Sequence, residues 1–425
     1  MSLFTAMSSA TSGIESSSTD LSVIGNNIAN ASTVGFKQGR ADFETALSQT
    51  LIGGNGQVGL GSDVATVQTI MTEGSLTNTG NTTDLALQGN GFFVLSGSYA
   101  GQQGTFYTRD GQFTVDKNGY LVTQQGLQVQ GFQANAAGVL SGVPSSLQVG
   151  NVQAQPVATA NVTLKANLDA SATVPPAWDP ANPTTTSNFS SSVTVYDSLG
   201  SAHAVQIFFR NTGGGWEWHA MADGGGLTGG TAGTLTEIAN GTLTFNSNGA
   251  LTAYTQASNF NPLGATNPQA LNFDFGNPIG ANGSTTGITQ FAATSATTFV
   301  GQDGYSAGQL SSIQVGQNGQ VSGVFSNGQT RLLGQVAVAG FQANDQLTSI
   351  GGNLYDATPA AGQAVVGAPG SGGLGSITSG ALEQSNVDLS TQLVDMIAAQ
   401  RAFEANSKTI TTADTLLSEL IQMKR

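Results

Sequence analysis

The sequence predicts a mainly β chain with α-helical termini, in which several domains are nested. Apolar residues recur with helical spacing only near the two ends. Strand-like runs separated by turn dipeptides fill the middle, and the segment Gly-Phe-Gln-Ala-Asn occurs at 131–135 and again at 340–344. Together these observations predict N- and C-terminal helices that form a coiled-coil-like inner domain, with two or more antiparallel β domains outside it.

An N-terminal helix is predicted over residues 1–28. Its apolar positions alternate spacings of four and three, as in a coiled-coil seam. The seam positions are Leu3, Met7, Ala10, Ile14, Ser17, Leu21, Ile24 and Ile28. The pattern stops at a turn-forming cluster at 30–35, and a second, short helix is predicted from 40 to 51.

Strands are predicted from about residue 64 to 380. Runs such as 91–95 and 192–196 are rich in aromatic or β-branched residues. Dipeptides such as Asn118-Gly119 and Asn248-Gly249 supply the positive φ angles of tight turns. We therefore expect hairpins at 113–122 and 243–254 in an antiparallel arrangement.

The last 40 residues return to a helical pattern. Apolar residues recur every seven positions at Leu382, Leu389, Met396, Phe403, Ile410 and Leu417, and Leu393, Ile397 and Ile421 widen the stripe. Asp388 is the predicted N-cap. The companion row expected for a coiled coil, Gln400, Ser407 and Asp414, is polar.

An isolated amphipathic helix is marginal in water, because its apolar face needs a partner. We expect the two terminal helices to pair with each other and to bury their remaining apolar surface against other copies of the chain. The alternative is that both helices pack on the β domains of their own chain.

Four regions are predicted from these patterns. The terminal helical domain comprises 1–30 and 385–425, and a connecting region comprises 31–75 and 367–384. A discontinuous β domain comprises 76–153 and 299–366, and an inserted outer β domain comprises 154–298. The repeated pentapeptide supports one domain made of two segments, although a match of five residues can also arise by chance.

Composition excludes several classes of function. Net charge is −14 with only 11 Lys and Arg, so we expect neither nucleic-acid binding nor attraction to an anionic membrane. No apolar run is long enough for membrane insertion, and the N-terminus lacks the pattern of a cleavable signal peptide. The absence of Cys excludes thiolate chemistry. We expect no enzymatic activity, no metal and no cofactor.

Two groups of residues are candidate binding sites. His203 and His219, with Asp197, Glu217 and Asp223 nearby in sequence, are possible metal ligands or bases, but histidines on strands are more often ordinary structural residues. Trp216 and Trp218 are suited to stacking on a sugar, although core positions are favoured. A secreted β-rich carbohydrate-binding protein is thus an alternative function.

Several motifs resemble those of the axial proteins of the bacterial flagellum, the family of rod and hook subunits. Residues 26–37 (NNIANASTVGFK) resemble the N-terminal signature of that family, and residues 84–93 and 107–113 resemble its next two blocks. Residues 382–389 and 396–406 resemble the C-terminal signature. The signature residues singled out are Asn26, Asn27, Asn30, Thr33, Gly35, Phe36, Gln400, Arg401 and Asn406.

The middle of the chain resembles the hook members of this family more than the rod members. The segments that carry this likeness are 195–200, 325–328 and 333–341. The resemblance implies a flexible tube that polymerises through its terminal helices, transmits torque as a universal joint and encloses an export channel. It implies an extracellular location reached by the flagellar type III export apparatus. Implied partners are other copies, the distal rod protein, the hook cap protein and the hook–filament junction protein; a distal rod subunit is the alternative within the family.

Overall fold

The computed structural model describes the chain except for residues 1–2, 47–48, 51–56, 59, 279–285 and 424–425. The chain forms two compact units. Unit 1 contains Met1–Val152, Ser311–Val324 and Thr330–Arg425, and unit 2 contains Gln153–Leu310 and Phe325–Gln329. Each unit therefore draws on separate stretches of the sequence.

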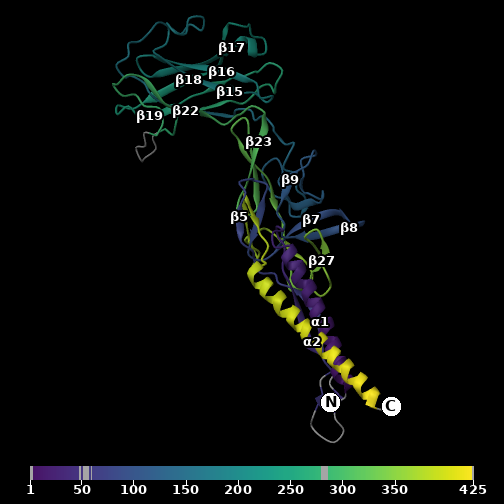
Figure 1. Ribbon diagram of the computed structural model, residues 1–425. Helices are drawn as coiled ribbons and strands as arrows, with labels where there is room; N and C mark the ends of the chain where they lie inside the picture. Colours follow the sequence, from purple (N-terminus) through teal and green to yellow (C-terminus); the bar gives the residue numbers. More distant parts are fainter. Residues whose placement is uncertain (1–2, 47–48, 51–56, 59, 279–285, 424–425) are drawn as a thin grey trace. The chain divides into compact units, whose positions relative to one another are not determined.

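Two long helices belong to unit 1, α1 (Leu3–Ala29) and α2 (Leu389–Met423). They lie side by side in Figure 1, which confirms that the two ends of the chain pair. The side chain of Asp388 caps α2 as predicted, because its Oδ1 accepts hydrogen bonds from the backbone N–H groups of Ser390 and Thr391. No helix in the described part of the chain is long and apolar enough to cross a membrane.

The remainder of unit 1 is built mainly from short antiparallel strands. Its main path runs β24-β25-β11-β7-β8-β28-β27. These strands are β24 (Gln320–Phe325), β25 (Thr330–Val336), β11 (Gln128–Gln133), β7 (Phe92–Tyr99), β8 (Gln102–Thr108), β28 (Leu354–Asp356) and β27 (Thr348–Gly351). The expected hairpin at 113–122 is confirmed, since Leu121 of β10 (Leu121–Thr123) pairs with Val115 of β9 (Phe113–Val115).

Smaller strands of unit 1 tie the chain near the helices. The pairs are β1 (Gly39–Thr45) with β4 (Ser62–Thr69), β2 (Gln49–Thr50) with β3 (Gln57–Val58), β6 (Leu85–Gln88) with β30 (Ser376–Ser379), and β5 (Leu76–Asn78) with β31 (Ala381–Glu383). Beside the main path lie β12 (Ser145–Ser146), β26 (Val338–Gly340) and β29 (Val365–Gly367).

The prediction of a short helix from 40 to 51 is wrong for the described part of that span, and residues 47, 48 and 51 lie outside it. Residues 39–45 form β1, which pairs along its length with β4. The amide of Asn27 in α1 bonds both the N–H and the C=O of Gly39, at 2.9 and 2.8 Å, and so fixes the start of this strand. A tertiary contact therefore overrides the local helical preference of these residues.

The two copies of the repeated pentapeptide begin in strands of the same sheet. Gly131 of the first copy pairs with Val336 of β25, and Gly340 of the second copy pairs with Val365 of β29. Both copies thus belong to one sheet of unit 1, although they lie more than 200 residues apart in sequence.

Unit 2 is a β structure with its own core. Its strands are β13 (Gln153–Ala154), β14 (Asn161–Asn167), β15 (Phe189–Tyr196), β16 (Ala202–Asn211), β17 (Trp216–Asp223), β18 (Leu235–Phe245), β19 (Leu251–Tyr254), β20 (Ala257–Ser258), β21 (Asn272–Asp274) and β22 (Ala296–Gln302). One further strand, β23 (Gly308–Val315), contains residues of both units. The predicted hairpin at 243–254 is confirmed by the pairing of Leu243 with Tyr254.

The tryptophans of unit 2 are core residues. Trp216 and Trp218 are 1% and 0% exposed, and they lie in one cluster with Phe273 and Phe275. Trp218 donates its indole N–H to the carbonyl of Thr255 at 3.2 Å. The favoured prediction of core positions is therefore confirmed, and the alternative of a sugar site is wrong because neither ring is accessible for stacking.

His203 lies close to one carboxylate, whereas His219 lies close to two, since its Nε2 is also 3.9 Å from Glu217 Oε1. His203 Nε2 is 3.1 Å from Asp197 Oδ2, and His219 Nδ1 is 2.8 Å from Glu237 Oε1. The ring of His219 also stacks on Trp178, with centroids 4.0 Å apart. Within the described ranges, His, Cys, Asp and Glu side chains form no group of three that could hold a metal ion.

A core substitution in unit 2 has a clean optical readout, because all three tryptophans lie in that unit. Leu164→Ala removes a side chain that is 0% exposed, and we expect it to lower the free energy of unfolding by about 2–5 kcal/mol. Tryptophan fluorescence during urea unfolding measures this change. The matched control, Leu199→Ala, removes a leucine that is 64% exposed and should stay within about 0.5 kcal/mol of the parent. Equal midpoints for the two variants would contradict the described core.

Candidate assembly surface

The helices α1 and α2 pack as an antiparallel pair. Asn27 near the end of α1 donates a hydrogen bond to Gln392 near the start of α2, at 2.9 Å. Gly13 lies against Asn406, since a Cβ atom at Gly13 would come 2.5 Å from Asn406 Nδ2. The glycine thus allows a close crossing of the two helices.

The face of α2 turned toward α1 follows a regular heptad pattern. Its positions alternate spacings of four and three along Gln392, Met396, Ala399, Phe403, Asn406, Ile410, Ala413 and Leu417. Gln392, Ala399 and Ala413 are buried, whereas Gln400 and Asp414 are exposed. The small residues Ala399 and Ala413 therefore let α1 approach, whereas Gln400 and Asp414, from the row noted as polar in the sequence, stay in solvent.

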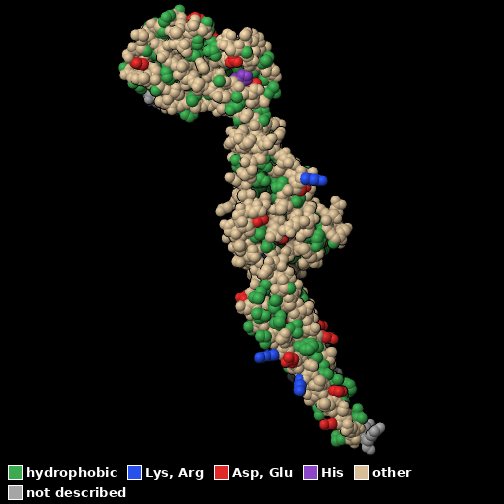
Figure 2. Space-filling view, turned by 45° about the horizontal axis from the view of Figure 1, so that its top comes forward, with side chains coloured by type: hydrophobic (Ala, Val, Ile, Leu, Met, Phe, Trp, Pro, Cys, Tyr) green, Lys and Arg blue, Asp and Glu red, His purple; other side chains and the backbone are tan. Residues whose placement is uncertain are grey.

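A second apolar face of α2 has no partner among the described residues. Leu389, Leu393 and Ile397 are 48%, 47% and 51% exposed, and Ile421 is 69% exposed. Figure 2 shows hydrophobic side chains gathered along the helical part of unit 1, at the lower end of the view. Such a row on a helix is suited to packing against another helix.

The structure places the predicted assembly residues in three environments. Ile24 is buried. The half-buried residues are Met7, Ile14, Leu21, Ile28, Met396, Ile410 and Leu417. The exposed residues are Leu389, Leu393, Phe403 and Ile421. Leu3 begins α1, and its side chain lies outside the described ones.

The N-terminal signature residues shape the exit from α1. Asn30 donates from its side chain to the carbonyl of Asn26 at 2.9 Å, and Thr33 donates to Asn30 Oδ1 at 3.1 Å. Gly35 has a φ of +70°, and a Cβ atom there would lie 2.7 Å from the backbone N of Asp110. Only glycine suits both the left-handed backbone and the close approach. Phe36 is half-buried beside this turn.

The C-terminal signature residues lie on different sides of α2. Gln400 and Arg401 are exposed, and Asn406 is half-buried against Gly13. The signature therefore combines one helix-pair contact with side chains that the single chain leaves in solvent.

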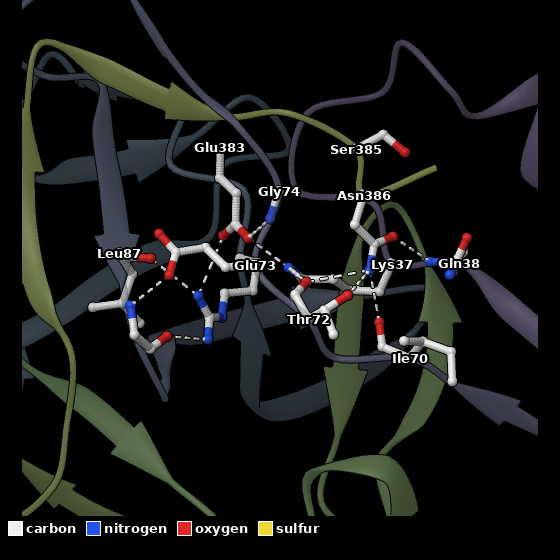
Figure 3. Close-up of polar contacts among 12 residues, drawn as sticks. Lys37, Gln38, Ile70, Thr72, Glu73, Gly74, Leu87, Glu383, Ser385 and Asn386 are labelled. Atoms are coloured by element: carbon white, nitrogen blue, oxygen red, sulfur yellow. Dashed lines mark hydrogen bonds and ion pairs between the residues drawn. The ribbon is translucent and has the colours of Figure 1, made fainter. Parts of the chain in front are cut away.

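Three buried charged side chains connect the segment that follows α1 with the segment that precedes α2. Lys37 donates to Glu383 Oε1 and, at 2.7 Å, to the carbonyl of Thr72. Arg109 Nη1 lies 3.3 Å from Glu383 Oε2, and the backbone N–H of Gly74 donates to Glu383 Oε1 at 3.0 Å. Figure 3 shows the contacts of Lys37 and Gly74 with the Glu383 carboxylate. We call Lys37, Arg109 and Glu383 the charged joint.

The side chains of the charged joint are buried from solvent, so each charge is stabilised mainly by its protein partners. The side chains of Lys37 and Glu383 are 0% exposed and that of Arg109 is 4% exposed. Burial lowers the pKa of the Lys37 amine, and the neighbouring Glu383 carboxylate opposes that shift. Arg109 also donates to the carbonyls of Leu87 and Gly89, at 3.1 and 2.6 Å. Removing Glu383 would leave Lys37 and Arg109 buried without this counter-charge.

Asn386 ties the same region together through its amide group. Its Oδ1 accepts from the N–H of Gln38 at 2.8 Å, and its Nδ2 donates to the carbonyl of Ile70 at 2.8 Å. The segment that leads into α2 is thus hydrogen-bonded to the residue before β1 and to the residue after β4 (Figure 3).

The three residues of the charged joint were not among the site residues predicted from the sequence. Its members lie within or beside the quoted motifs, since Lys37 ends the N-terminal signature, Arg109 lies in 107–113 and Glu383 lies in 382–389. A usable signal was present, because only 8% of the residues are charged and an isolated charge inside a motif is uncommon in such a chain. Because these residues are more than 270 positions apart in sequence, their pairing could be identified only in the folded structure.

Comparisons with known proteins cover almost the whole chain. Residues 7–37 match the family described as "Flagella basal body rod protein", and residues 378–423 match "Flagellar basal body rod FlgEFG protein C-terminal". Residues 86–174 match "Flagellar hook protein FlgE/F/G D1 domain", and residues 167–305 match "Flagellar basal body protein FlaE D2 domain".

Relatives of similar length carry one name. "Flagellar hook protein FlgE" of Escherichia coli K12 is 37% identical over 99% of this chain and 100% of its own. The proteins of that name from Salmonella typhimurium and Borreliella burgdorferi are 37% and 34% identical, over 99% and 98% of this chain and 100% and 98% of their own.

Glu383→Gln tests the charged joint, because it removes the negative charge while keeping the shape of the side chain. We expect the free energy of unfolding of unit 1 to fall by about 3–5 kcal/mol, since Lys37 and Arg109 would stay buried without a counter-charge. Circular dichroism at 222 nm follows unit 1, which contains both long helices. Glu404→Gln, the same change at an exposed site on α2, should alter stability by less than about 0.5 kcal/mol. Unchanged unfolding of Glu383→Gln would show that the joint is dispensable.

Proposed function

The chain belongs to the flagellar hook protein family, and we propose that it is a non-enzymatic subunit that polymerises with its own copies into the tube of the hook. The family resolves the choice between hook and rod, because full-length relatives are named as hook proteins. The rod descriptions match only the two ends of the chain.

The main support for polymerisation is the apolar face of α2 that has no partner within the described part of the single chain. Leu389, Leu393 and Ile397 are each about half exposed and follow one another at a spacing of four residues. Burying one such side chain fully is favourable by about 1.5–3 kcal/mol. Neighbouring copies in a tube are the partners that supply this burial.

The charged joint gives the polymer a defined connection between its helices and its β structure. It fixes the chain within a few residues of both helix roots, through groups that are buried and directionally bonded. A subunit in a torque-transmitting universal joint needs such a connection, because force applied to the outer part must reach the tube wall. Few surface ion pairs in a chain with 8% charged residues would let outer contacts slide as the tube bends.

We also propose the nested organisation of the subunit. In it, 1–30 and 385–425 form the inner tube around an export channel, and 31–75 with 367–384 form the connection. The remaining regions are a β domain of 76–153 and 299–366 and an outer domain of 154–298. The separate cores support it, as does the start of unit 2 at Gln153.

The partners proposed are those of a hook at its two ends and during export. They are the distal rod protein, the hook cap protein, the hook–filament junction protein and the flagellar type III export apparatus. The proposed location is the extracellular hook of the bacterial flagellum, reached without a cleaved signal peptide. Support comes from membership of the hook family.

Truncation at either end tests polymerisation directly. We expect tubes in electron micrographs and fast-sedimenting material from the full chain, and neither from chains lacking Leu3–Ala29 or Leu389–Met423. Loss of either helix leaves its antiparallel partner unpaired. Tubes formed by both truncated chains would refute assembly through the helices.

Leu393→Asp separates assembly from folding. Because Leu393 is 47% exposed in the single chain, the variant should unfold within about 0.5 kcal/mol of the parent. It should nevertheless raise the critical concentration for assembly at least tenfold, since a charge buried in an apolar contact costs more than about 1.4 kcal/mol. Val143→Asp, at a residue that is 74% exposed in unit 1, is the control. Equal critical concentrations would show that this face of α2 is free in the polymer.

A further inference from the structure

An acidic groove runs along the junction of α1, α2 and β1. It has a volume of about 630 Å³, and its carboxylates are Asp20, Asp388 and Asp395. Much of its α2 wall is made of small side chains, including Thr391, Ala398 and Ala402. The groove is therefore open to an approaching side chain or helix.

The charges of the acidic groove are not neutralised within the single chain. Among the described residues, no Lys or Arg forms an ion pair with Asp20, Asp388 or Asp395. Arg40 also lines the groove, but its guanidinium group is bonded to Asp42 and Gln68, at 2.9 and 2.8 Å. Burial and the nearby Asp395 carboxylate raise the pKa of Asp20, as expected for acids that lack a counter-charge.

Two basic residues of α2 are also without an acidic partner. Arg401 and Lys408 are exposed, and within the described ranges neither forms an ion pair. At about 100° per residue, both fall on the outer side of α2, roughly 160–180° round the helix from Ala399 in the seam. Glu404 lies between them in sequence but about 40–60° away from their row.

The acids and the bases have the same spacing. Asp388 and Asp395 are seven residues apart, and so are Arg401 and Lys408. Arg401 follows Asp388 by thirteen residues, as Lys408 follows Asp395. Two parallel α2 helices from different copies would thus match both pairs at once, if one were shifted along the axis by about 20 Å.

We propose that the acidic groove of one copy receives the basic row of a neighbouring copy, with Arg401 meeting Asp388 and Lys408 meeting Asp395. This contact rests on the proposed polymerisation and adds the register, which is the axial shift between the α2 helices of neighbouring copies. Because the groove and the row are different surfaces of one chain, the contact is heterologous and does not close on itself, as a helical tube requires. The apolar face around Leu393 remains for other contacts between copies.

Charge exchange tests the register. Asp395→Lys and Lys408→Asp should each raise the critical concentration for assembly about threefold or more, because each replaces an attraction with a repulsion. The variant that carries both changes should return to within about twofold of the parent. Glu15→Lys makes the same change at an exposed acid outside the groove and should have a smaller effect than Asp395→Lys. Loss of assembly in the double variant, or normal assembly in both single variants, would overturn the proposal.

Disulfide trapping gives a second, independent readout in a chain that has no Cys of its own. Asp395→Cys combined with Lys408→Cys places the two thiols about 20 Å apart within one helix, too far to bridge inside one copy. Oxidised tubes should give a ladder of covalent multimers on non-reducing gels, and Glu15→Cys with Lys408→Cys should not. Tubes without a ladder would overturn the register while leaving polymerisation intact. Absence of tubes from the parent chain would instead refute the proposed function.

Discussion

The buried carboxylate of Glu383 is the constraint on which the rest of unit 1 depends. It lies between Lys37 and Arg109 and also accepts the N–H of Gly74. A carboxylate at 0% exposure is tolerated only when cations and donors surround it, so segments far apart in sequence must meet there. Lys37 follows α1 by eight residues, and Glu383 precedes α2 by six. The charged joint therefore sets the positions at which α1 and α2 are attached to the β structure of unit 1.

Once the end of α1 and the start of α2 are held in place, the pairing of the two helices follows from side-chain size. Gly13, Ala399 and Ala413 permit a close antiparallel approach, and polar contacts such as Asn27 with Gln392 set the register. The pair buries one row of α2 and leaves a second apolar row in solvent. A single chain thus satisfies only part of the helical surface, which is the physical basis for assembly by a member of the hook family.

Unit 2 is organised on a different principle. Its core is continuous and aromatic, and it holds Trp216, Trp218, Phe273 and Phe275 without help from the terminal helices. Burial of these rings removes the surface that sugar binding would need. His203 has one close carboxylate and His219 has two. These features are those of a stable structural module, and they agree with the structural role of the family.

Local patterns in the sequence predict the helical ends, the β middle, the hairpins at Asn-Gly turns and the N-cap Asp388, because these depend on neighbours within a few residues. Motif resemblance also indicated the family. Tertiary structure decided the rest. Residues 39–45 became a strand because Asn27 and β4 bind them, and the α2 seam uses Ala399 because α1 approaches there. The joint of Lys37, Arg109 and Glu383 and the acidic groove depend on residues hundreds of positions apart, so periodicity along the chain does not reveal them.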